Sequence, residues 1–462
     1  MSHNDLKILL VSSRSPEHSA HLGGDIVNAL LGKGCAVDFL SLYPSSHEHP
    51  YPVYTVLDRT PRKVKDILLG KLSNRFYGYL KKLSKPVRSM LRKGLRPLSS
   101  RKQRIGIDRK ESGFFYLNEN LPEVEPELLL GKIPPKQKYD LIITLFWQDM
   151  LNSTSIKALY DCFKAPVYIY SVDMAPVTGG CYYFNDCDRY KHDCGKCPCL
   201  SSTDYNDRSH QNFIVKRNNY SASRVFFLGN TWMLRQALAG GLFNADNVLK
   251  MGIIIDENSF KPGDSSAAGR KLGLPVNRDI VLLVRSAYEK RKGADIISYA
   301  MTDLWDNIPD AYRRRICLVS IGDDNLQEIF KKHRHDIPLV NLGIVDKSML
   351  ICVYRAAALF LNPSTNDAGP SMVNQSIMCG TPVVSFNLGT AVDVVENGVS
   401  GFKTDDISRE GFARTLRTAV DSIVNNTFPD IRRTSREKAL MHNTSQVFAD
   451  RLLGHYHTLT PS

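Results

Sequence analysis

Short apolar runs alternate with helical stretches along this chain, and the alternation occurs twice. Such runs are typical of buried strands in a parallel sheet. The first set of predicted strands comprises residues 7–13, 36–40, 139–145, 166–170 and 224–228, and the second comprises residues 279–284, 316–320, 339–342, 359–362 and 383–386. Strands that alternate with helices indicate a parallel sheet covered on both faces. The sequence therefore predicts an α/β fold with two doubly wound, Rossmann-like domains.

The length of 462 residues is sufficient for two domains that each bury a core. Residues 256–275 are rich in Gly, Ser and Pro and lie between the two sets of strands, so we expect the linker there. We predict a first domain over residues 1–255 and a second over residues 256–434. Residues 435–462 are predicted to contain a last amphipathic helix.

Positive charge is concentrated in one segment. The chain carries a formal net charge of +13, and residues 59–110 contain 18 Lys or Arg against only two Asp. The rest of the chain is slightly acidic, which argues against nucleic-acid binding through the whole surface. Apolar residues recur every three or four positions within the segment, as in amphipathic helices. Two interpretations stay open: a solvated helical insertion docked on the first domain, and basic helices resting on an anionic membrane surface.

No apolar run reaches the roughly 18 residues that a membrane-spanning helix needs. The first residues also lack the charged and apolar regions of a signal peptide. We therefore expect a cytoplasmic protein, held peripherally at the inner face of the plasma membrane if residues 59–110 bind lipid.

Gly23 and Gly24 lie where a predicted strand turns into a predicted helix. Backbone N–H groups at such a turn, together with the helix dipole, favour a phosphate or a polar substrate. A glycine pair alone is a weak signal, and tight turns often contain one. The G-x-G-x-x-G pattern of dinucleotide-binding proteins is missing, so a hydride-transferring oxidoreductase is poorly supported.

The second set of strands carries cations at a position suited to a diphosphate. Arg285 follows the first of these strands, and Lys290, Arg291 and Lys292 precede Gly293. Cations at the carboxyl end of a strand, beside a helix N-terminus, are placed to hold a diphosphate. The alternative is a solvated charged loop.

A second strand-to-helix connection contains polar and small residues. Asp367 precedes a turn, and Gln375 lies about one helical turn inside the helix that follows. The turn exposes backbone donors at the helix N-terminus and comprises Gly369, Pro370, Ser371, Met372 and Val373. This arrangement is suited to sugar hydroxyls, phosphate oxygens and a ribose.

Together with the Cys-Gly-Thr-Pro-Val-Val run that begins at Cys379, these motifs resemble the retaining GT-B glycosyltransferases of family 4. The resemblance implies two Rossmann-like domains facing a central cleft, with a C-terminal helix that crosses back to the first domain. It also implies a nucleotide-sugar donor, with Arg285 and either Lys292 or Lys290 on its diphosphate. In that family the leaving diphosphate helps to deprotonate the acceptor, so the resemblance implies that no side-chain base is required. We also expect that transfer requires no cofactor.

The sequence departs from the family pattern at two places. The family has two Glu residues eight positions apart, and this chain has Asp367 and Gln375 at these two positions. The resemblance implies that Asp367 contacts the donor sugar and that Gln375 contacts the ribose. Val172 occupies the position of a histidine found in many relatives, so no catalytic histidine is carried over. We predict Asp367 and Asp173 as catalytic residues, with Asp173 positioning the acceptor; the alternative for Asp173 is a turn aspartate.

Five cysteines fall within residues 181–199, with the spacing C-x5-C-x6-C-x2-C for the first four. This spacing favours a structural, four-thiolate zinc site formed by Cys181, Cys187, Cys194 and Cys197. Reduced, packed thiols and disulfides are the alternatives, and Cys199 is a spare. A closed site of this kind would stabilise the loop and would take no part in catalysis. A subset of the family associated with bacterial surface polysaccharides shares the Thr-Gly-Gly-Cys and Cys-Pro elements.

The sequence therefore predicts a retaining glycosyltransferase that moves a sugar from a nucleotide-diphosphate donor to a saccharide or lipid-linked acceptor. We expect a role in cell-surface polysaccharide synthesis, in lipopolysaccharide, capsule or exopolysaccharide, and no nucleic-acid partner. The alternative is a non-catalytic GT-B scaffold that regulates a polysaccharide assembly complex at the membrane.

Overall fold

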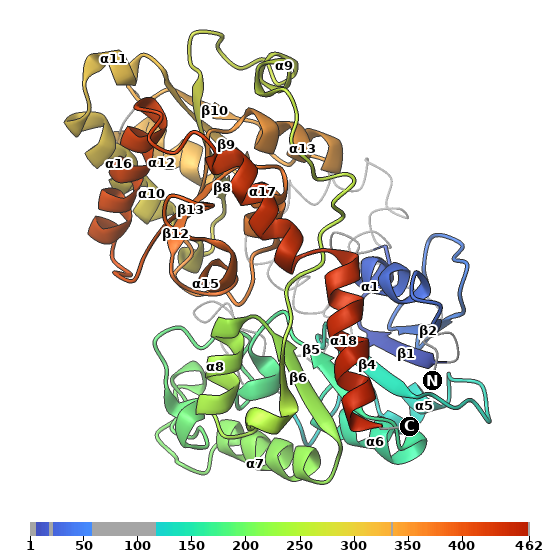
Figure 1. Ribbon diagram of the computed structural model, residues 1–462. Helices are drawn as coiled ribbons and strands as arrows, with labels where there is room; N and C mark the ends of the chain where they lie inside the picture. Colours follow the sequence, from blue (N-terminus) through green and yellow to red (C-terminus); the bar gives the residue numbers. More distant parts are fainter. Residues whose placement is uncertain (1–5, 18–21, 58–116, 334–335, 461–462) are drawn as a thin grey trace, which may run out of the picture.

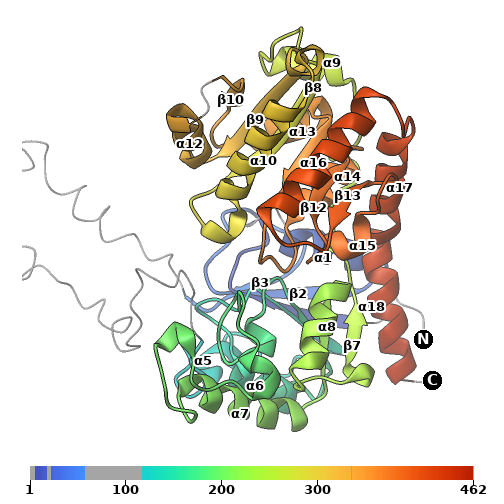
Figure 2. The ribbon, with the colours of Figure 1, turned by 90° about the vertical axis from the view of Figure 1, so that its left-hand side faces the viewer.

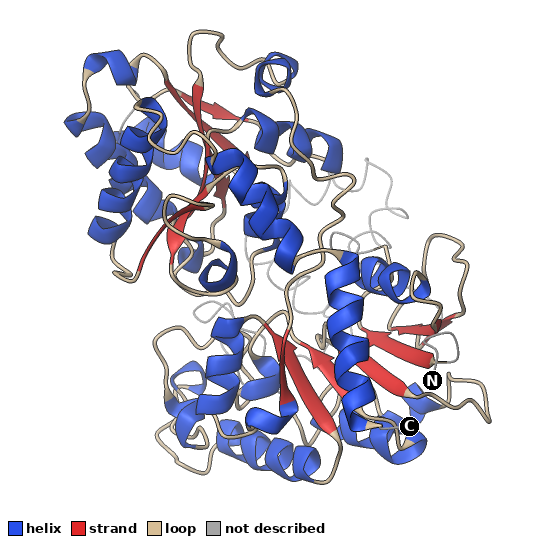
Figure 3. Ribbon diagram, viewed as in Figure 1, coloured by secondary structure: helices blue, strands red, loops and turns tan. Residues whose placement is uncertain are grey.

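The structure is a computed structural model, and it describes residues 6–17, 22–57, 117–333 and 336–460. The predicted basic segment, residues 59–110, lies outside the described residues. The described part forms two α/β domains, one above the other in Figure 1. Helices cover both faces of each sheet, as Figure 3 shows.

The first domain is built on a parallel sheet of seven strands in the order β3-β2-β1-β4-β5-β6-β7. Its strands are β1 (Lys7–Ser12), β2 (Ala36–Ser41), β3 (Val53–Thr55), β4 (Leu141–Leu145), β5 (Val167–Tyr170), β6 (Val225–Gly229) and β7 (Val248–Lys250). The central strand β1 pairs with both β2 and β4, so the strand order reverses there. Ligands of open α/β sheets bind at such a reversal, beyond the carboxyl ends of the strands.

The second domain repeats this plan with six parallel strands in the order β10-β9-β8-β11-β12-β13. Its strands are β8 (Ile280–Ser286), β9 (Ile316–Gly322), β10 (Leu339–Asn341), β11 (Leu359–Asn362), β12 (Val383–Phe386) and β13 (Gly401–Thr404). The order reverses between β8 and β11. Two doubly wound parallel sheets confirm the predicted fold class.

Helices connect the strands of each sheet. Among the described residues of the first domain they are α1 (Leu22–Leu31), α5 (Pro126–Leu130), α6 (Ser153–Phe163), α7 (Arg208–Ser221) and α8 (Thr231–Ala239), with the short 3-10 turns η3 (Ala175–Val177), η4 (Arg189–His192), η5 (Pro198–Leu200) and η6 (Ala245–Asn247). In the second they are α9 (Ser265–Lys271), η7 (Lys290–Lys292), α10 (Ala294–Asn307), α11 (Asp310–Arg313), α12 (Asn325–His333), α13 (Lys347–Ala356), α14 (Ser371–Met378), α15 (Ala391–Val394) and α16 (Arg409–Val424).

The cores follow from the alternation of side chains along each strand. In β1, Leu9 and Val11 pack on one face of the sheet, and Ile8 and Leu10 pack on the other. All four side chains are completely buried. The same division into two buried clusters occurs in the second domain, which explains why the strands read as continuous apolar runs.

The predicted last helix is wrong in one respect, because the chain forms two helices there. Helix α17 (Ile431–His442) packs on the second domain, and α18 (Ser445–Leu459) runs along the first beside α1 (Figures 1 and 2). The break falls at Asn443, whose Nδ2 donates to the carbonyl oxygen of Ile253 at 2.7 Å. Thr444 then caps α18 by accepting from the N–H of Val447.

The predicted linker, residues 256–275, also differs from expectation because it contains helix α9. Asp264 caps this helix by accepting from the N–H groups of Ser266 and Ala267, and the helix packs on α13. None of the helices within the described ranges is long and apolar enough to cross a membrane.

Candidate functional site

A cavity of about 200 Å³ lies between the domains, beyond the carboxyl ends of β8 and β11. This is the point where the strand order of the second sheet reverses. Tyr183 and Val172 line it from the first domain. Seven of the residues predicted from the sequence line it from the second: Arg285, Lys292, Asp367, Gly369, Pro370, Ser371 and Met372.

Lys292 and Asp367 form an ion pair in this cavity. The ammonium of Lys292 donates to Asp367 Oδ2, and Arg291 Nη1 lies 3.5 Å from the same oxygen. The side chains of Lys292 and Asp367 are only 11% and 8% exposed, so little water screens the pair. Burial lowers the pKa of Lys292, and the charge of Asp367 opposes that shift.

The backbone around Gly293 determines which of Lys290 and Lys292 lines the cavity. Gly293 has φ +70°, and a Cβ there would lie 2.5 Å from the carbonyl oxygen of Pro363. Only glycine tolerates both the positive φ and this close approach to the Pro363 carbonyl oxygen. The η7 turn therefore packs tightly on the loop after β11. This packing points Lys292 into the cavity, whereas Lys290 is exposed and is not among the lining residues.

Gln375 lies away from the cavity. It is 4% exposed within α14, and its Oε1 accepts a hydrogen bond from the Tyr354 hydroxyl at 3.1 Å. Val373 is completely buried in the core of the second domain and does not line the cavity either. The structure therefore brings neither residue to the predicted donor site.

The glycine pair, Gly23 and Gly24, also lies outside the residues that line the cavity. Both belong to the first turn of α1. A Cβ on Gly23 would meet the ring of Phe39 at 3.2 Å, and one on Gly24 would meet the Pro16 carbonyl oxygen at 3.1 Å. The described contacts of the pair are those of close helix packing.

Asp173 lies beside the cavity on the first domain, next to Val172. Its Oδ1 accepts a hydrogen bond from the N–H of Ala175 at 2.9 Å, as a turn aspartate does. Burial raises the pKa of Asp173 to about 7, and this hydrogen bond and the charge of Lys216 oppose that shift. Its carboxyl group therefore titrates near neutral pH, which suits a group that binds an acceptor hydroxyl.

Several contacts join the two domains near the cavity. The Arg291 guanidinium lies over the Tyr183 ring, and Asn366 Nδ2 donates to Asn185 Oδ1 at 3.4 Å. At the base of α8, the N–H of Thr231 donates to Asp393 Oδ2 at 2.8 Å. Sequence reasoning did not identify these pairs, because no local pattern marks two residues that meet only across the domains.

The five clustered cysteines line one small cavity of about 20 Å³ in the first domain. Asp193, Cys194, Gly195 and Lys196 all have positive φ, and the N–H of Gly179 donates to Cys194 Sγ at 3.2 Å. Burial raises the pKa of the Cys181 thiol to about 12. Within the described ranges, however, no group of three or more His, Cys, Asp or Glu side chains is arranged to hold a metal ion. The zinc site stays a prediction.

Comparison with known proteins agrees with this architecture. Residues 266–428 match the family of glycosyl transferases group 1. A D-inositol 3-phosphate glycosyltransferase of Acidothermus cellulolyticus is 28% identical over 203 residues, which are 42% of this chain and 45% of that relative. Another, of Streptomyces bingchenggensis, is 29% identical over 167 residues, which are 34% and 36% of the two chains. The matches thus span less than half the length of these curated relatives.

Solved structures resemble the whole chain. Anabaena HepE in complex with UDP and glucose superposes with a TM-score of 0.59 over 99% of this chain and 100% of its own, at 14% identity. The chain has a GT-B fold. Sucrose-phosphate synthase from Thermosynechococcus elongatus gives a TM-score of 0.62 over 98% and 99% of the two chains, also at 14% identity. WaaG, a glycosyltransferase involved in lipopolysaccharide biosynthesis, gives 0.55 over 99% and 100% at 11% identity.

Proposed function

We propose that the protein is a retaining glycosyltransferase that transfers a sugar from a nucleotide-diphosphate donor to a saccharide or lipid-linked acceptor. The observation that carries this proposal is the meeting of Arg285 and Lys292 in one cavity with Asp367. Two cations in a crevice at a sheet reversal suit a diphosphate, and a carboxylate beside them suits sugar hydroxyls. The solved complex of HepE with UDP and glucose supports a nucleotide-sugar donor.

In the proposed reaction the bond between the anomeric carbon and the donor diphosphate breaks, and the acceptor oxygen bonds to that carbon. The acceptor proton passes to the leaving diphosphate. Arg285 and Lys292 stabilise the negative charge that develops on the diphosphate, while Asp367 orients the sugar. The reaction requires no cofactor.

We also propose a role in the synthesis of a cell-surface polysaccharide. The support is the resemblance in the Thr-Gly-Gly-Cys region and the structural likeness to WaaG. The D-inositol 3-phosphate glycosyltransferases among the relatives make a phosphorylated polyol the competing acceptor class.

The deciding experiment measures donor binding and turnover together. Thermal shifts with UDP, GDP, ADP and their sugars identify the donor, because a ligand stabilises the folded state as its concentration exceeds its Kd. We expect Lys292→Ala to weaken binding at least tenfold and Asp367→Ala to reduce turnover. Lys290→Ala is the matched control and should behave as the unmodified protein.

Each alternative has a defined outcome. Nucleotide-sugar binding without hydrolysis or transfer, with membranes present, would favour the non-catalytic scaffold. If Lys292→Ala and Lys290→Ala bind nucleotide equally well, the proposed diphosphate site is wrong.

A further inference from the structure

A buried ion pair lies beneath the loop that carries Asp173. The ammonium of Lys216, from α7, stands 3.4 Å from Oε1 of Glu119, and both side chains have zero solvent exposure. Lys and Glu are rarely buried completely, because removing either charge from water is unfavourable unless partners replace the water. The hydrogen-bond partners of Lys216 and Glu119 therefore show which segments the ion pair holds in place.

The ammonium of Lys216 binds the loop itself. It donates to the carbonyl oxygen of Ala175 at 2.6 Å and to that of Thr178 at 2.7 Å, at the two ends of the η3 turn. The N–H of the same Ala175 donates to Asp173 Oδ1. Lys216 and Asp173 are thus attached to opposite sides of one peptide segment.

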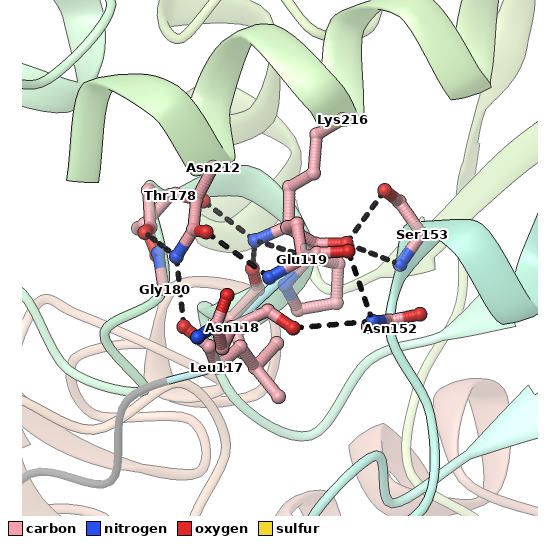
Figure 4. Close-up of polar contacts among 12 residues, drawn as sticks. Leu117, Asn118, Glu119, Asn152, Ser153, Thr178, Gly180, Asn212 and Lys216 are labelled. Atoms are coloured by element: carbon pink, nitrogen blue, oxygen red, sulfur yellow. Dashed lines mark hydrogen bonds and ion pairs between the residues drawn. The ribbon is translucent and has the colours of Figure 1, made fainter. Parts of the chain in front are cut away.

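The carboxylate of Glu119 is fixed from another direction, as Figure 4 shows. Its Oε2 accepts from both the N–H and the hydroxyl of Ser153, each at 2.7 Å, at the start of α6. The N–H of Glu119 donates to Asn212 Oδ1 at 3.0 Å, and Asn212 Nδ2 donates to the Gly179 carbonyl oxygen at 2.9 Å. Two helices thereby hold both the ion pair and the Thr178–Gly180 turn.

The groups that face Asp173 give the ion pair an electrostatic role as well. Lys216 is the cation that acts on Asp173, and the Tyr182 and Tyr183 hydroxyls belong to its surroundings. Burial favours the protonated form of Asp173, whereas Lys216 favours the carboxylate. Loss of the ammonium would therefore shift Asp173 toward the neutral acid.

We infer that Lys216, held by Glu119, is a positioning residue of the acceptor side: it fixes the Asp173 loop and maintains the carboxylate that binds a hydroxyl of the saccharide acceptor. This inference rests on the proposed glycosyltransferase function. A loop support without an electrostatic role is the competing explanation.

The test compares the pH dependence of kcat for the unmodified protein, Glu119→Gln and the double variant Lys216→Gln/Glu119→Gln. The double variant replaces the pair with two amides, so that no single charge is left buried without its partner. We expect the acidic limb of the profile to move up by about one to two pH units in the double variant. Glu119→Gln alone retains the ammonium and should show no upward shift.

A second measurement does not depend on activity. The difference in Tm between each protein and its Asp173→Asn derivative, followed from pH 4 to 9, reports the ionisation of Asp173 in the folded state. The difference should grow from about pH 4 and level off near pH 7 in the unmodified protein, and it should level off at a higher pH in the double variant.

The outcomes separate this inference from the proposed function. Absence of turnover with any nucleotide sugar would overturn the function, while the pH at which each Tm difference levels off would still show whether Lys216 acts on Asp173. Tm differences that level off at the same pH and coincident pH profiles for all three proteins would overturn the inference. An equal upward shift in Glu119→Gln would also overturn it, because that variant keeps the ammonium.

Discussion

The guanidinium of Arg291 lies 3.8 Å from the centroid of the Tyr183 ring and so joins the second domain to the first at the edge of the cavity. Glu289 and Asp367 both form ion pairs with this guanidinium. Arg291 therefore contacts two carboxylates and an aromatic ring. These contacts connect the two domains at the edge of the cavity.

Removal of the Tyr183 ring should weaken this connection. A cation–π contact contributes about 0.5 to 2 kcal/mol, so Tyr183→Ala should lower kcat/KM for transfer by roughly twofold to thirtyfold. Tyr183→Phe is the matched control, because it keeps the aromatic ring and should stay much closer to the unmodified enzyme. Equal losses in the two variants would show that the hydroxyl, and not the ring, matters.

Gln375 should act on stability more than on donor binding. Its side chain accepts from the buried Tyr354 hydroxyl, and Gln375→Ala would leave that donor unsatisfied. Loss of a buried partner costs about 1 to 3 kcal/mol, which urea unfolding should detect as a lower midpoint. If Gln375→Ala instead keeps its stability and binds the nucleotide sugar as poorly as Lys292→Ala, the family-derived role at the ribose is correct.

The strands predicted from the sequence were those with continuous apolar runs. β1, for example, is buried on both faces, and both its faces are therefore apolar. Three short strands of the described part of the chain were missed: β3, β7 and β13. The side chains of β3 are all partly exposed, so this strand lacks the continuous apolar run of a buried strand. The break at Asn443 was missed because a tertiary hydrogen bond to Ile253 accompanies it.

The site was predictable where it depends on topology. Arg285, Asp367 and the turn at Gly369 meet because parallel strands end at the same edge of a sheet. The selection of Lys292 over Lys290 required the backbone of Gly293, which packs on Pro363. The sequence indicates the pair of Lys216 and Glu119 only indirectly. Its one sign is that Asn212, Lys216 and Tyr220 recur at helical spacing, on what is the buried face of α7.

The cysteine cluster gives a prediction that elemental analysis can check. The spacing predicts about one zinc ion per chain when the protein is purified without chelator. A double variant, Cys194→Ala/Cys197→Ala, should lose that metal, whereas Cys162→Ser, at an exposed cysteine outside the cluster, should keep it. Metal-free protein with reactive, reduced thiols would instead support the packed thiol cluster.

Asp25 should make the stability of the protein depend on pH. It lies in α1 of the first domain, and the negative charges of Asp256 and Glu257 act on it from the segment that joins the domains. Burial, together with the charges of Asp256 and Glu257, raises the pKa of Asp25 to about 7, and the charge of Lys347 opposes that rise. The folded protein thus binds a proton between about pH 4 and 7 that the unfolded chain has released.

This difference fixes the sign of the effect. Because the folded state binds more protons in that window, the free energy of unfolding falls as the pH rises from 4 to 7, by at most about 4 kcal/mol. Asp25→Asn cannot ionise, so its Tm should exceed that of the unmodified protein increasingly up to about pH 7 and stay constant above it. Asp256→Asn removes a like charge, and in that background the Tm difference should become constant at a lower pH. A Tm difference that is the same at pH 5 and pH 8 would contradict the prediction.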